Sequence, residues 1–168
     1  MAMRNIREEG DSILLKRSRP VTDYNARLHT LLDDMRETLL HADGVGLAAP
    51  QVGVLRRVVI VMDTNREDLT PEEQIIELVN PCIVASDGEQ EGQEGCLSLP
   101  GVYGIVKRPE HVVVRANDRF GSEFQVEGTG LTARCFCHEI DHLDGHLFTE
   151  RAERILSQEE LEEMNRDQ

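Results

Sequence analysis

Aromatic side chains are scarce in this sequence, and tryptophan is absent. Aromatic residues make up 4% of the 168 positions. Hydrophobic residues still account for 39% of the chain, so the composition predicts a globular protein whose core consists mainly of Leu, Val and Ile. A chain of this length has room for one compact core, and we expect residues 1–168 to form a single domain.

Long apolar runs are also missing. No segment reaches the roughly 20 apolar residues that a membrane-spanning helix needs. Residues 1–5 lack the apolar stretch of a secretory signal. We therefore expect a cytoplasmic protein without a membrane partner, in which the four cysteines are reduced thiols and form no disulfides.

Basic residues are few compared with acidic ones. The chain has 18 Lys and Arg against 32 Asp and Glu, which gives a formal net charge of −14. We therefore expect no direct nucleic-acid binding by the protein as a whole, although a net charge does not exclude a local basic patch.

The apolar pattern predicts both helices and strands. Leu and Met residues at helical spacing predict a helix over residues 23–41, with Thr22 or Asp23 as its N-cap. A second apolar segment predicts a helix over residues 131–143 that ends near Gly145. Runs rich in β-branched residues predict five strands, over residues 57–62, 75–79, 83–86, 111–116 and 123–127.

The remaining segments are interpreted from their composition. Residues 11–17 predict a short helical turn, residues 44–53 a glycine-rich loop, and residues 88–95 an acidic, flexible segment. Ser157 and Glu160 form a capping box for a final helix over about residues 157–165. This order predicts an α+β fold, with mixed or antiparallel sheets packed around the helix over residues 131–143.

Two histidines stand four residues apart in the segment His138-Glu139-Ile140-Asp141-His142. Four residues turn a helix by about 400° and advance it by about 6 Å, so both imidazoles lie on one face and can share a metal ion. Glu139 lies about 100° away, which suits a general base acting on a water that the metal activates. A structural metal, or two surface histidines without a metal, is also consistent with this pattern.

A catalytic site of this kind usually has three protein ligands. The third could be Cys96, another cysteine or a downstream carboxylate. Cys96 follows a glycine and has polar flanks, a setting in which a thiolate is accessible. Cys135 lies one turn before His138 and could line the pocket. We expect Cys137 to point away from the metal and Cys82 to be a small buried residue.

Residues 44–51 read Gly-Val-Gly-Leu-Ala-Ala-Pro-Gln, which formally matches a dinucleotide-binding fingerprint. That motif must follow a strand and open a helix. Here it follows a predicted helix, and Pro50 would interrupt a new one. We therefore favour the glycine-rich wall of a substrate cleft, in which Gln51 presents its amide to a reacting oxygen. A plain turn without a role is the alternative.

Taken together, three segments of the chain resemble the peptide deformylase family. The family carries a Gly-x-Gly-x-Ala-Ala-x-Gln segment, a Glu-Gly-Cys-Leu-Ser segment and a helix with the two-histidine motif, in that order. The matching segments are residues 44–51, 94–98 and 138–142. The resemblance extends to residues 5–21 and 100–104 and covers the chain to about Phe148.

The resemblance implies a role for each matching residue. The implied metal ligands are Cys96, His138 and His142. Glu139 would be the general acid and base, and Gln51 with the backbone amide of Leu97 would hold the developing oxyanion. The residues implied to contact substrate are Gly46, through its backbone, and Val45, Leu131 and Cys135, which would line the pocket for a methionine side chain. Glu94 and Arg108 would steady the Cys96 loop.

The implied reaction is hydrolysis of the formyl amide of N-formylmethionyl nascent peptides, with release of formate. A water activated by one divalent metal would attack the formyl carbonyl, with Glu139 moving the proton. The family implies Fe²⁺ in the cell, with Zn²⁺, Ni²⁺ or Co²⁺ accepted in purified protein, and a bacterial-type cytoplasmic location.

Two features depart from the family pattern. Cys137 stands where the family usually has Gln. The resemblance leaves the ribosome exit region as a possible partner. Some members dock there through a basic C-terminal helix, but the chain after Thr149 carries seven acidic and three basic residues, which argues against that mode. Two other functions also fit the two-histidine motif: an endopeptidase, and a metal-stabilised binding module without catalysis.

Overall fold

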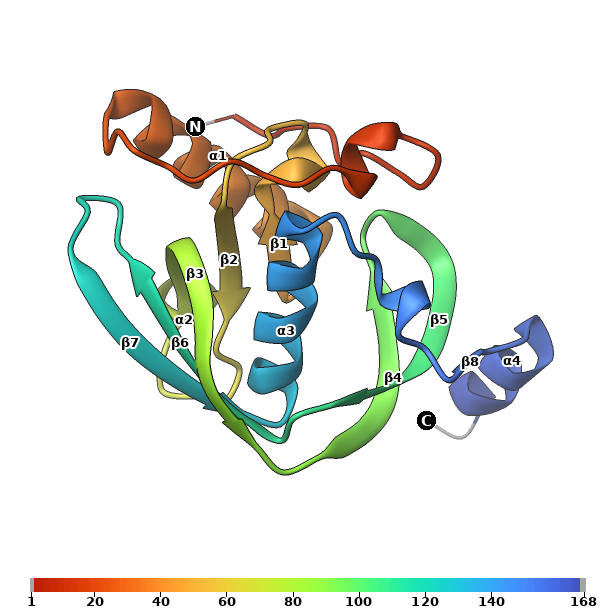
Figure 1. Cartoon of the computed structure of the whole chain (residues 1–168). Helices are drawn as coiled ribbons and strands as arrows, with labels where there is room; N and C mark the ends of the chain where they lie inside the picture. The colour runs from red at the N-terminus through yellow and green to blue at the C-terminus, as the bar shows by residue number, and fades with distance from the viewer. Residues whose placement is uncertain (1, 167–168) are drawn as a thin grey trace.

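Two β-sheets form the framework of the molecule in the computed structural model, which describes residues 2–166 (Figure 1). The larger sheet has the order β1-β2-β3-β6-β7. Its strands are β1 (Gly46–Ala48), β2 (Val58–Met62), β3 (Ile75–Asp87), β6 (His111–Asn117) and β7 (Glu123–Thr129). The smaller sheet has the order β4-β5-β8, with β4 (Gln90–Cys96), β5 (Leu99–Arg108) and β8 (Arg154–Ile155). Every strand pair is antiparallel, so the expected α+β class is confirmed.

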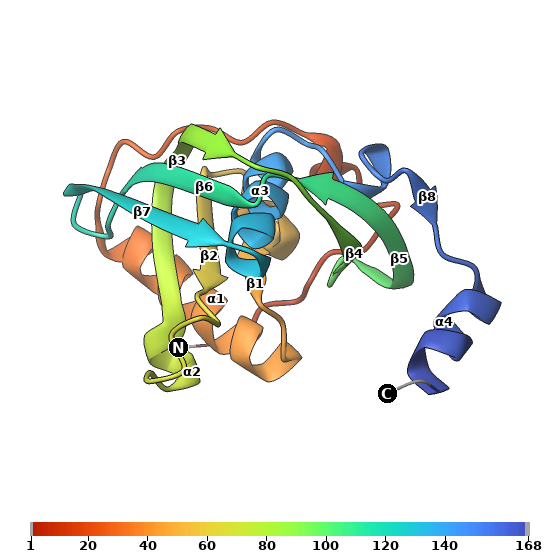
Figure 2. The same cartoon turned by 90° about the horizontal axis from the view of Figure 1, so that it is seen from below.

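Helices lie on and between these sheets. The α-helices are α1 (Ala26–Ala42), α2 (Pro71–Gln74), α3 (Leu131–Leu143) and α4 (Gln158–Arg166). Short 3-10 helices are η1 (Ser12–Leu15), η2 (Ala49–Val52) and η3 (Phe148–Glu150). Figures 1 and 2 show α3 between the two sheets and α1 on the opposite side of the larger sheet.

Strand β2 packs against α3 on one face of the larger sheet and against α1 on the other. Val59 and Val61 pack in one core with the apolar residues of α3. Val58 and Ile60 pack in the other core with α1. A strand that is buried on both faces reads as a continuous apolar run instead of an alternating one, as residues 58–62 do.

Helix α3 is buried on nearly every side, because it contacts both sheets. Its predicted bounds of 131–143 are confirmed. Only Leu131, at its start, is exposed, and Asp141 is half-buried. The polar side chains of a helix in this position need partners inside the protein. The candidate functional site lies among these buried polar side chains.

The start of α1 differs from the prediction. Asn25 is the N-cap, and its side chain accepts a hydrogen bond from the Leu28 amide, so the assignment to Thr22 or Asp23 is wrong. The preceding residues stay extended because the Val21 backbone is held at both ends by the Asn80 side chain, at 2.8 and 2.9 Å. A contact 59 residues away in sequence therefore delays the helix.

Two predicted strands, over residues 75–79 and 83–86, are parts of one long strand, β3. Its pairing with β6 shifts register between Val79 and Cys82, where Asn80 adopts a positive φ of 51°. The irregularity lets one strand continue past a proline. Cys82 is exposed after this shift, so its predicted burial is wrong.

The predicted flexible segment over residues 88–95 is largely strand β4, paired with β5, a strand that the apolar pattern did not predict. Glycine is required at Gly95, because a Cβ there would lie 2.6 Å from the Tyr103 ring. The acidic composition misleads because Glu94 is buried and paired with arginines from elsewhere in the chain.

The final helix, α4, begins where the capping box predicts. The Glu160 amide donates to Ser157 Oγ at 3.1 Å, and the Ser157 amide donates to Glu160 Oε1 at 3.3 Å. No residue of α4 is buried, and the helix stands away from the body (Figures 1 and 2). Among residues 2–166, no helix is both long and apolar enough to cross a bilayer. Met1, Asp167 and Gln168, the ends of the predicted domain, lie outside the described residues.

Candidate metal centre

The two histidines of α3 share one buried face, as their spacing predicts. His138 and His142 are 7% and 1% exposed, and their ring centroids are 5.0 Å apart. Each ring offers a nitrogen ligand of the kind that zinc and other divalent transition metals prefer. Helix α3 therefore places two imidazole nitrogens, potential metal ligands, close together on its buried face.

Cys96, at the end of β4, is brought to the same point. Its Sγ lies 3.4 Å from His142 Nε2, and one ligand atom from each of Cys96, His138 and His142 lies within 4.8 Å of the others. Within the described part of the chain, no further carboxylate or cysteine joins this group. The structure thus brings together three residues whose types suit a metal. Two of them, Cys96 and His138, are 42 positions apart in the sequence.

Glu94 sets the orientation of His138. Its Oε1 lies 2.6 Å from His138 Nδ1, which leaves Nε2 as the nitrogen available to a metal. Arg108 donates to both Glu94 oxygens, at 2.6 and 3.1 Å, and Arg134 donates at 2.7 Å. Burial opposes ionisation of Glu94, but His138 and Arg108 outweigh it and lower its pKa to about 2.

Arg134 is a contributor that the sequence interpretation missed. It lies one helical turn before His138 and is 6% exposed. A charged residue inside an otherwise apolar helix signals a buried partner, because an unpaired charge cannot be held there. Arg108 continues the network to Asp141 at 2.9 Å, and Arg151 also donates to Asp141.

The histidines differ in electrostatic environment. Burial alone would lower the pKa of His138, but the Glu139 charge and the contacts with Cys96 and Glu94 raise it to about 10. Burial and the nearby His138 charge lower the pKa of His142 to about 3. A metal requires both imidazoles in the neutral form, so binding here would release a proton from His138.

Glu139 lies against the glycine-rich segment. A Cβ on Gly46 would come within 2.7 Å of Glu139 Oε2, so only glycine permits this approach. Glu139 is 5% exposed, and its Oε1 is buried without a hydrogen-bond partner among the described residues. Burial raises its pKa to about 7. A carboxylate with this pKa exchanges protons readily near neutral pH.

The predicted loop over residues 44–53 contains β1 and the 3-10 helix η2, which fix Gln51 in place. Gln51 is 1% exposed, and its Oε1 accepts from the Ala48 amide at 2.9 Å. Its amide nitrogen therefore faces Ser98 Oγ, at 3.0 Å, and Cys96 Sγ, at 3.5 Å. Because no α-helix follows β1, the geometry of a dinucleotide-binding turn is not formed.

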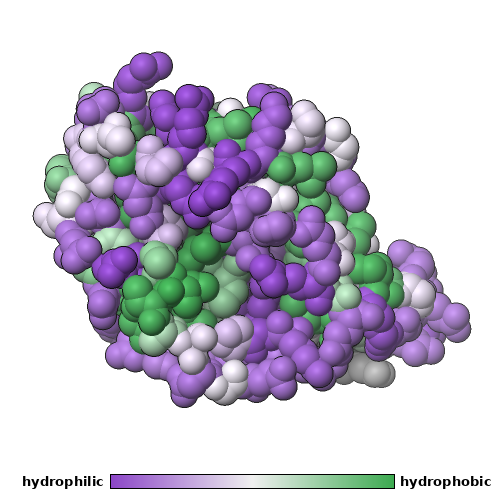
Figure 3. Space-filling view, viewed as in Figure 1, coloured by the Kyte–Doolittle hydropathy of each residue, from purple (hydrophilic) through white to green (hydrophobic). Residues whose placement is uncertain are grey.

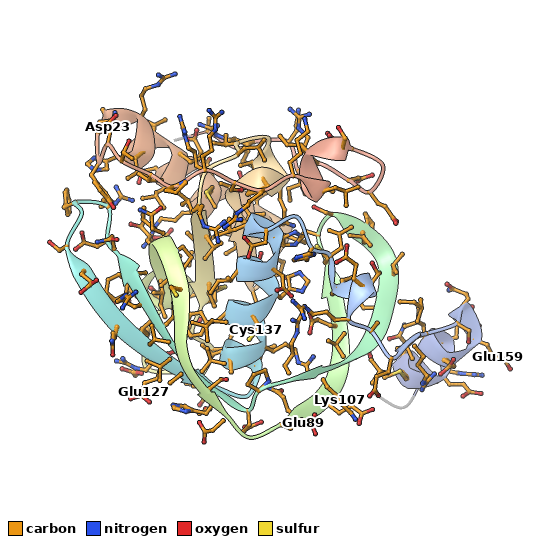
Figure 4. All side chains as sticks on the ribbon, in the orientation of Figure 1. Asp23, Glu89, Lys107, Glu127, Cys137 and Glu159 are labelled. Carbon is orange, nitrogen blue, oxygen red and sulfur yellow. The ribbon has the colours of Figure 1, made fainter. Side chains whose placement is uncertain are left out.

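A cavity of about 260 Å³ opens beside these groups. Its lining includes every residue predicted to contact substrate, namely Val45, Gly46, Leu131 and Cys135, together with Gln51, Leu97 and Glu139. Val45 and Leu131 are partly exposed at its rim, whereas Cys135 is buried, and burial raises the pKa of its thiol. Cys137 packs in the apolar core (labelled in Figure 4).

The ligand set and its surroundings fit a divalent metal. Three soft or borderline donors converge, the imidazole of His138 is oriented by a carboxylate, and a buried carboxylate oxygen of Glu139 lacks a protein partner. Together with a cleft between antiparallel sheets, this arrangement is typical of metal-dependent hydrolases.

Comparison with known proteins narrows the class to one family. The polypeptide deformylase family model matches residues 3–158. A peptide deformylase from Lachnoclostridium phytofermentans is 56% identical over 151 residues, 90% of each chain, and one from Thermoanaerobacter pseudethanolicus is 51% identical over 164 residues, 98% of each chain. A crystal structure of a peptide deformylase from Legionella pneumophila superposes with a TM-score of 0.82 at 42% identity, covering 98% of this chain and 96% of that one. The chain belongs to the polypeptide deformylase family.

Proposed function

We propose that this protein is a metal-dependent hydrolase that removes the N-terminal formyl group from formyl-methionyl nascent peptides and releases formate. The observation that carries the proposal is the convergence of Cys96, His138 and His142 within 4.8 Å, beside the buried carboxylate of Glu139. Membership of the deformylase family supplies the substrate class. We propose that residues 1–168 act as one catalytic domain around α3.

Cys96, His138 and His142 would hold the metal. One thiolate and two neutral imidazoles leave a divalent ion with a net charge of +1, so a bound ion would lower the pKa of water and polarise a carbonyl oxygen. Thiolate and imidazole donors accept Fe²⁺, Co²⁺, Ni²⁺ and Zn²⁺. The family resemblance favours Fe²⁺ in the cell.

The chain's own residues perform the proton transfers. Glu139 accepts a proton from the attacking water as the new C–O bond forms at the formyl carbon. It then donates this proton to the amine nitrogen as the C–N bond breaks. Its pKa of about 7 suits both steps. The products are formate and a peptide with a free N-terminal amine.

The developing oxyanion needs hydrogen-bond donors. The Gln51 amide nitrogen, held toward Cys96 by its contacts with Ala48 and Ser98, is one such donor. The Leu97 backbone amide is the second in this proposal. One donor of this kind typically contributes about 3 kcal/mol to transition-state stability.

The cavity supplies a place for the first side chain of the substrate. Val45, Leu131 and Cys135 give it an apolar wall, which would accept the methionine side chain, and Gly46 would contact the substrate through its backbone. A Cβ on Gly46 would come within 2.7 Å of Glu139 Oε2, so the space beside this carboxylate is limited. In this proposal, the limited space favours the small formyl group over a larger acyl group.

The family and the free cysteines support a proposal for the cellular location. We propose a bacterial-type cytoplasmic location, which suits the bacterial relatives and the four free cysteines. We assign no ribosome-docking role to α4, because its first turn is acidic and RNA would repel it.

The deciding experiment is turnover of a formyl-Met tripeptide by anaerobically prepared protein, with metal analysis. Glu139→Gln should keep the metal and the fold but lose deformylation. Retained turnover in this variant would refute the assigned role of Glu139. Cleavage of an internal bond in the unformylated peptide at a similar rate would instead favour an endopeptidase, and metal binding without any turnover would favour a binding module.

A further inference from the structure

Most basic side chains of this acidic protein have an acidic partner. Of the 18 Lys and Arg residues, all of which lie within residues 2–166, all but five have a carboxylate oxygen of these described residues within 4.0 Å. The five exceptions are Lys16, Arg19, Arg27, Arg56 and Arg166.

Four of the five exceptions lie on one side of the molecule, and we call them the basic face: Lys16, Arg19, Arg27 and Arg56. All four are exposed. The segments that carry them, namely the N-terminal segment, the start of α1 and the loop before β2, lie along the upper edge of Figure 1. Figure 3 shows mostly hydrophilic residues along this edge. The fifth exception, Arg166, lies in α4 at the other end of the molecule (Figure 1).

Two members of the basic face are held side by side by the backbone. Arg19 and Arg56 form an isolated parallel bridge, in which the Arg19 amide donates to Leu55 O and the Arg57 amide donates to Arg19 O. Like charges on directly paired residues destabilise a pairing. The fold therefore holds two exposed arginines at paired backbone positions, with no carboxylate oxygen of the described residues within 4.0 Å of either. An external anion would relieve the repulsion between them.

Arg56 of this pair lines a cavity of about 570 Å³. Arg27 and Arg56 line it, with Arg4, and none of the predicted catalytic or metal-binding residues does. Arg4 is already paired with Asp34, at 3.0 Å. Asp23, at the upper left of Figure 4, is the exposed acid of this lining.

The basic face continues along the chain from this cavity. Lys16 and Arg19 belong to one extended segment, so three residues separate them by up to about 10 Å. Two acids beside this segment are already paired, Asp11 with Arg7 at 3.1 Å and Asp144 with Arg57 at 3.0 Å. Because Lys16 and Arg19 lie outside the cavity that Arg27 and Arg56 line, the four cations do not surround one point. This spread fits a linear polyanion better than a small anion.

We propose that the basic face binds the phosphate backbone of RNA without sequence specificity. The proposed function gives the biological setting, because nascent peptides emerge from an RNA-rich particle, but the binding itself does not depend on deformylation. The composition predicts no RNA affinity because net charge averages over the whole surface. Four phosphate contacts on a protein of charge −14 give weak binding, with a dissociation constant of about 10⁻⁴ M at physiological salt.

The test is fluorescence anisotropy of a labelled 20-nucleotide oligouridylate, titrated with the full-length protein between 20 and 200 mM salt. Four contacts to a single strand predict that log K falls with log salt with a slope of about −3. The triple variant Arg19→Glu, Arg27→Glu, Arg56→Glu should bind at least about 10-fold more weakly and lose most of this slope. The triple Gln variant should show a smaller loss in the same direction.

The matched control is Arg66→Glu, Arg115→Glu, Arg166→Glu, which changes the net charge equally at other exposed positions. This control should retain binding to within about 2-fold. An equal loss in both triple variants, or no salt-dependent binding by the unmodified protein at 20 mM salt, would overturn the proposal. Displacement of the RNA by a polyglutamate of equal charge would also overturn it, by showing that the face accepts acidic protein segments.

Turnover of the free formyl-Met tripeptide separates the two proposals. Both triple variants should deformylate this peptide at the rate of the unmodified protein, because neither set of residues lies at the metal centre. This result also shows that the variants are folded. Absence of turnover in the unmodified protein would count against the proposed function and would leave the RNA result unaffected.

Discussion

Glu94 Oε1 lies 2.6 Å from His138 Nδ1, and this contact joins a strand of the smaller sheet to helix α3 at the candidate metal centre. Glu94 comes from β4, the strand that also ends in Cys96, whereas His138 comes from α3. One carboxylate therefore fixes a helix residue relative to the strand that carries Cys96, the proposed third ligand. Arg108 and Arg134 hold Glu94 in the ionised form that this task requires.

Glu94→Gln should weaken metal binding while the protein remains folded. The amide still accepts from the arginines, but it no longer offers a charged acceptor to His138. Loss of such an outer partner typically costs 10- to 100-fold in metal affinity. The measurement is the dissociation constant from competition with a chelator, and Glu91→Gln, an exposed residue of the same strand, is the control. Equal affinities in the two variants would contradict this positioning role.

Features set by residues close together in the sequence were predicted better than features set by contacts between distant residues. The bounds of α3, the shared face of its histidines and the capping box of α4 follow from spacing within one helix. The β4–β5 hairpin does not, because its acidic residues become compatible with a strand only when Arg134, about 40 positions away, pairs with Glu94. Similarly, the delayed start of α1 depends on Asn80, which no local pattern reveals.

Gly46→Ala should abolish most activity while the protein remains folded. The added Cβ would lie 2.7 Å from Glu139 Oε2, and the flexible end of that side chain can move away at little cost to the fold. A displaced carboxylate no longer reaches the water and the amine, so we expect a fall in kcat of about 100-fold, the contribution of general acid–base catalysis. The metal content should not change, because no ligand is touched. A variant with normal kcat would show that Glu139 need not occupy this position.

Gln51→Met tests the oxyanion donor. The substitution keeps the shape of the side chain but removes the amide nitrogen that faces Cys96 and Ser98. We expect kcat to fall by about 100-fold, or about 3 kcal/mol, with a small change in KM. Stability should also fall by about 1–3 kcal/mol, because the Ala48 amide loses its acceptor. Gln125→Met, on an exposed strand position, is the control, and a rise in KM at constant kcat would argue for substrate binding instead.

His111 predicts a pH dependence of stability far from the metal centre. Its two ring nitrogens lie 2.6 Å from Asp87 and 2.7 Å from Glu127, and these contacts raise its pKa above 6.5. A raised pKa in the folded state stabilises the protein fully below the unfolded pKa, and this stabilisation disappears as pH rises through the folded pKa. The difference in urea midpoint between the unmodified protein and His111→Gln should therefore be largest near pH 5.5 and should shrink toward pH 8.5. A constant difference would mean that the ring acts only as a neutral hydrogen-bonding group.

Removal of the metal should destabilise the protein and abolish activity together. An ion present at 100 times its dissociation constant stabilises the folded state by about 2.7 kcal/mol, and a chelator removes this contribution. Tm should therefore fall on chelation and recover when Fe²⁺ or Zn²⁺ is added back under anaerobic conditions. In Cys96→Ala, which loses the thiolate ligand, Tm should respond much less to chelator. Aerobic storage should inactivate the Fe²⁺ form faster than the Zn²⁺ form, because oxygen attacks a redox-active ion next to a thiolate. If chelation lowers activity but leaves the Tm of the unmodified protein unchanged, the metal lies outside the cluster of Cys96, His138 and His142.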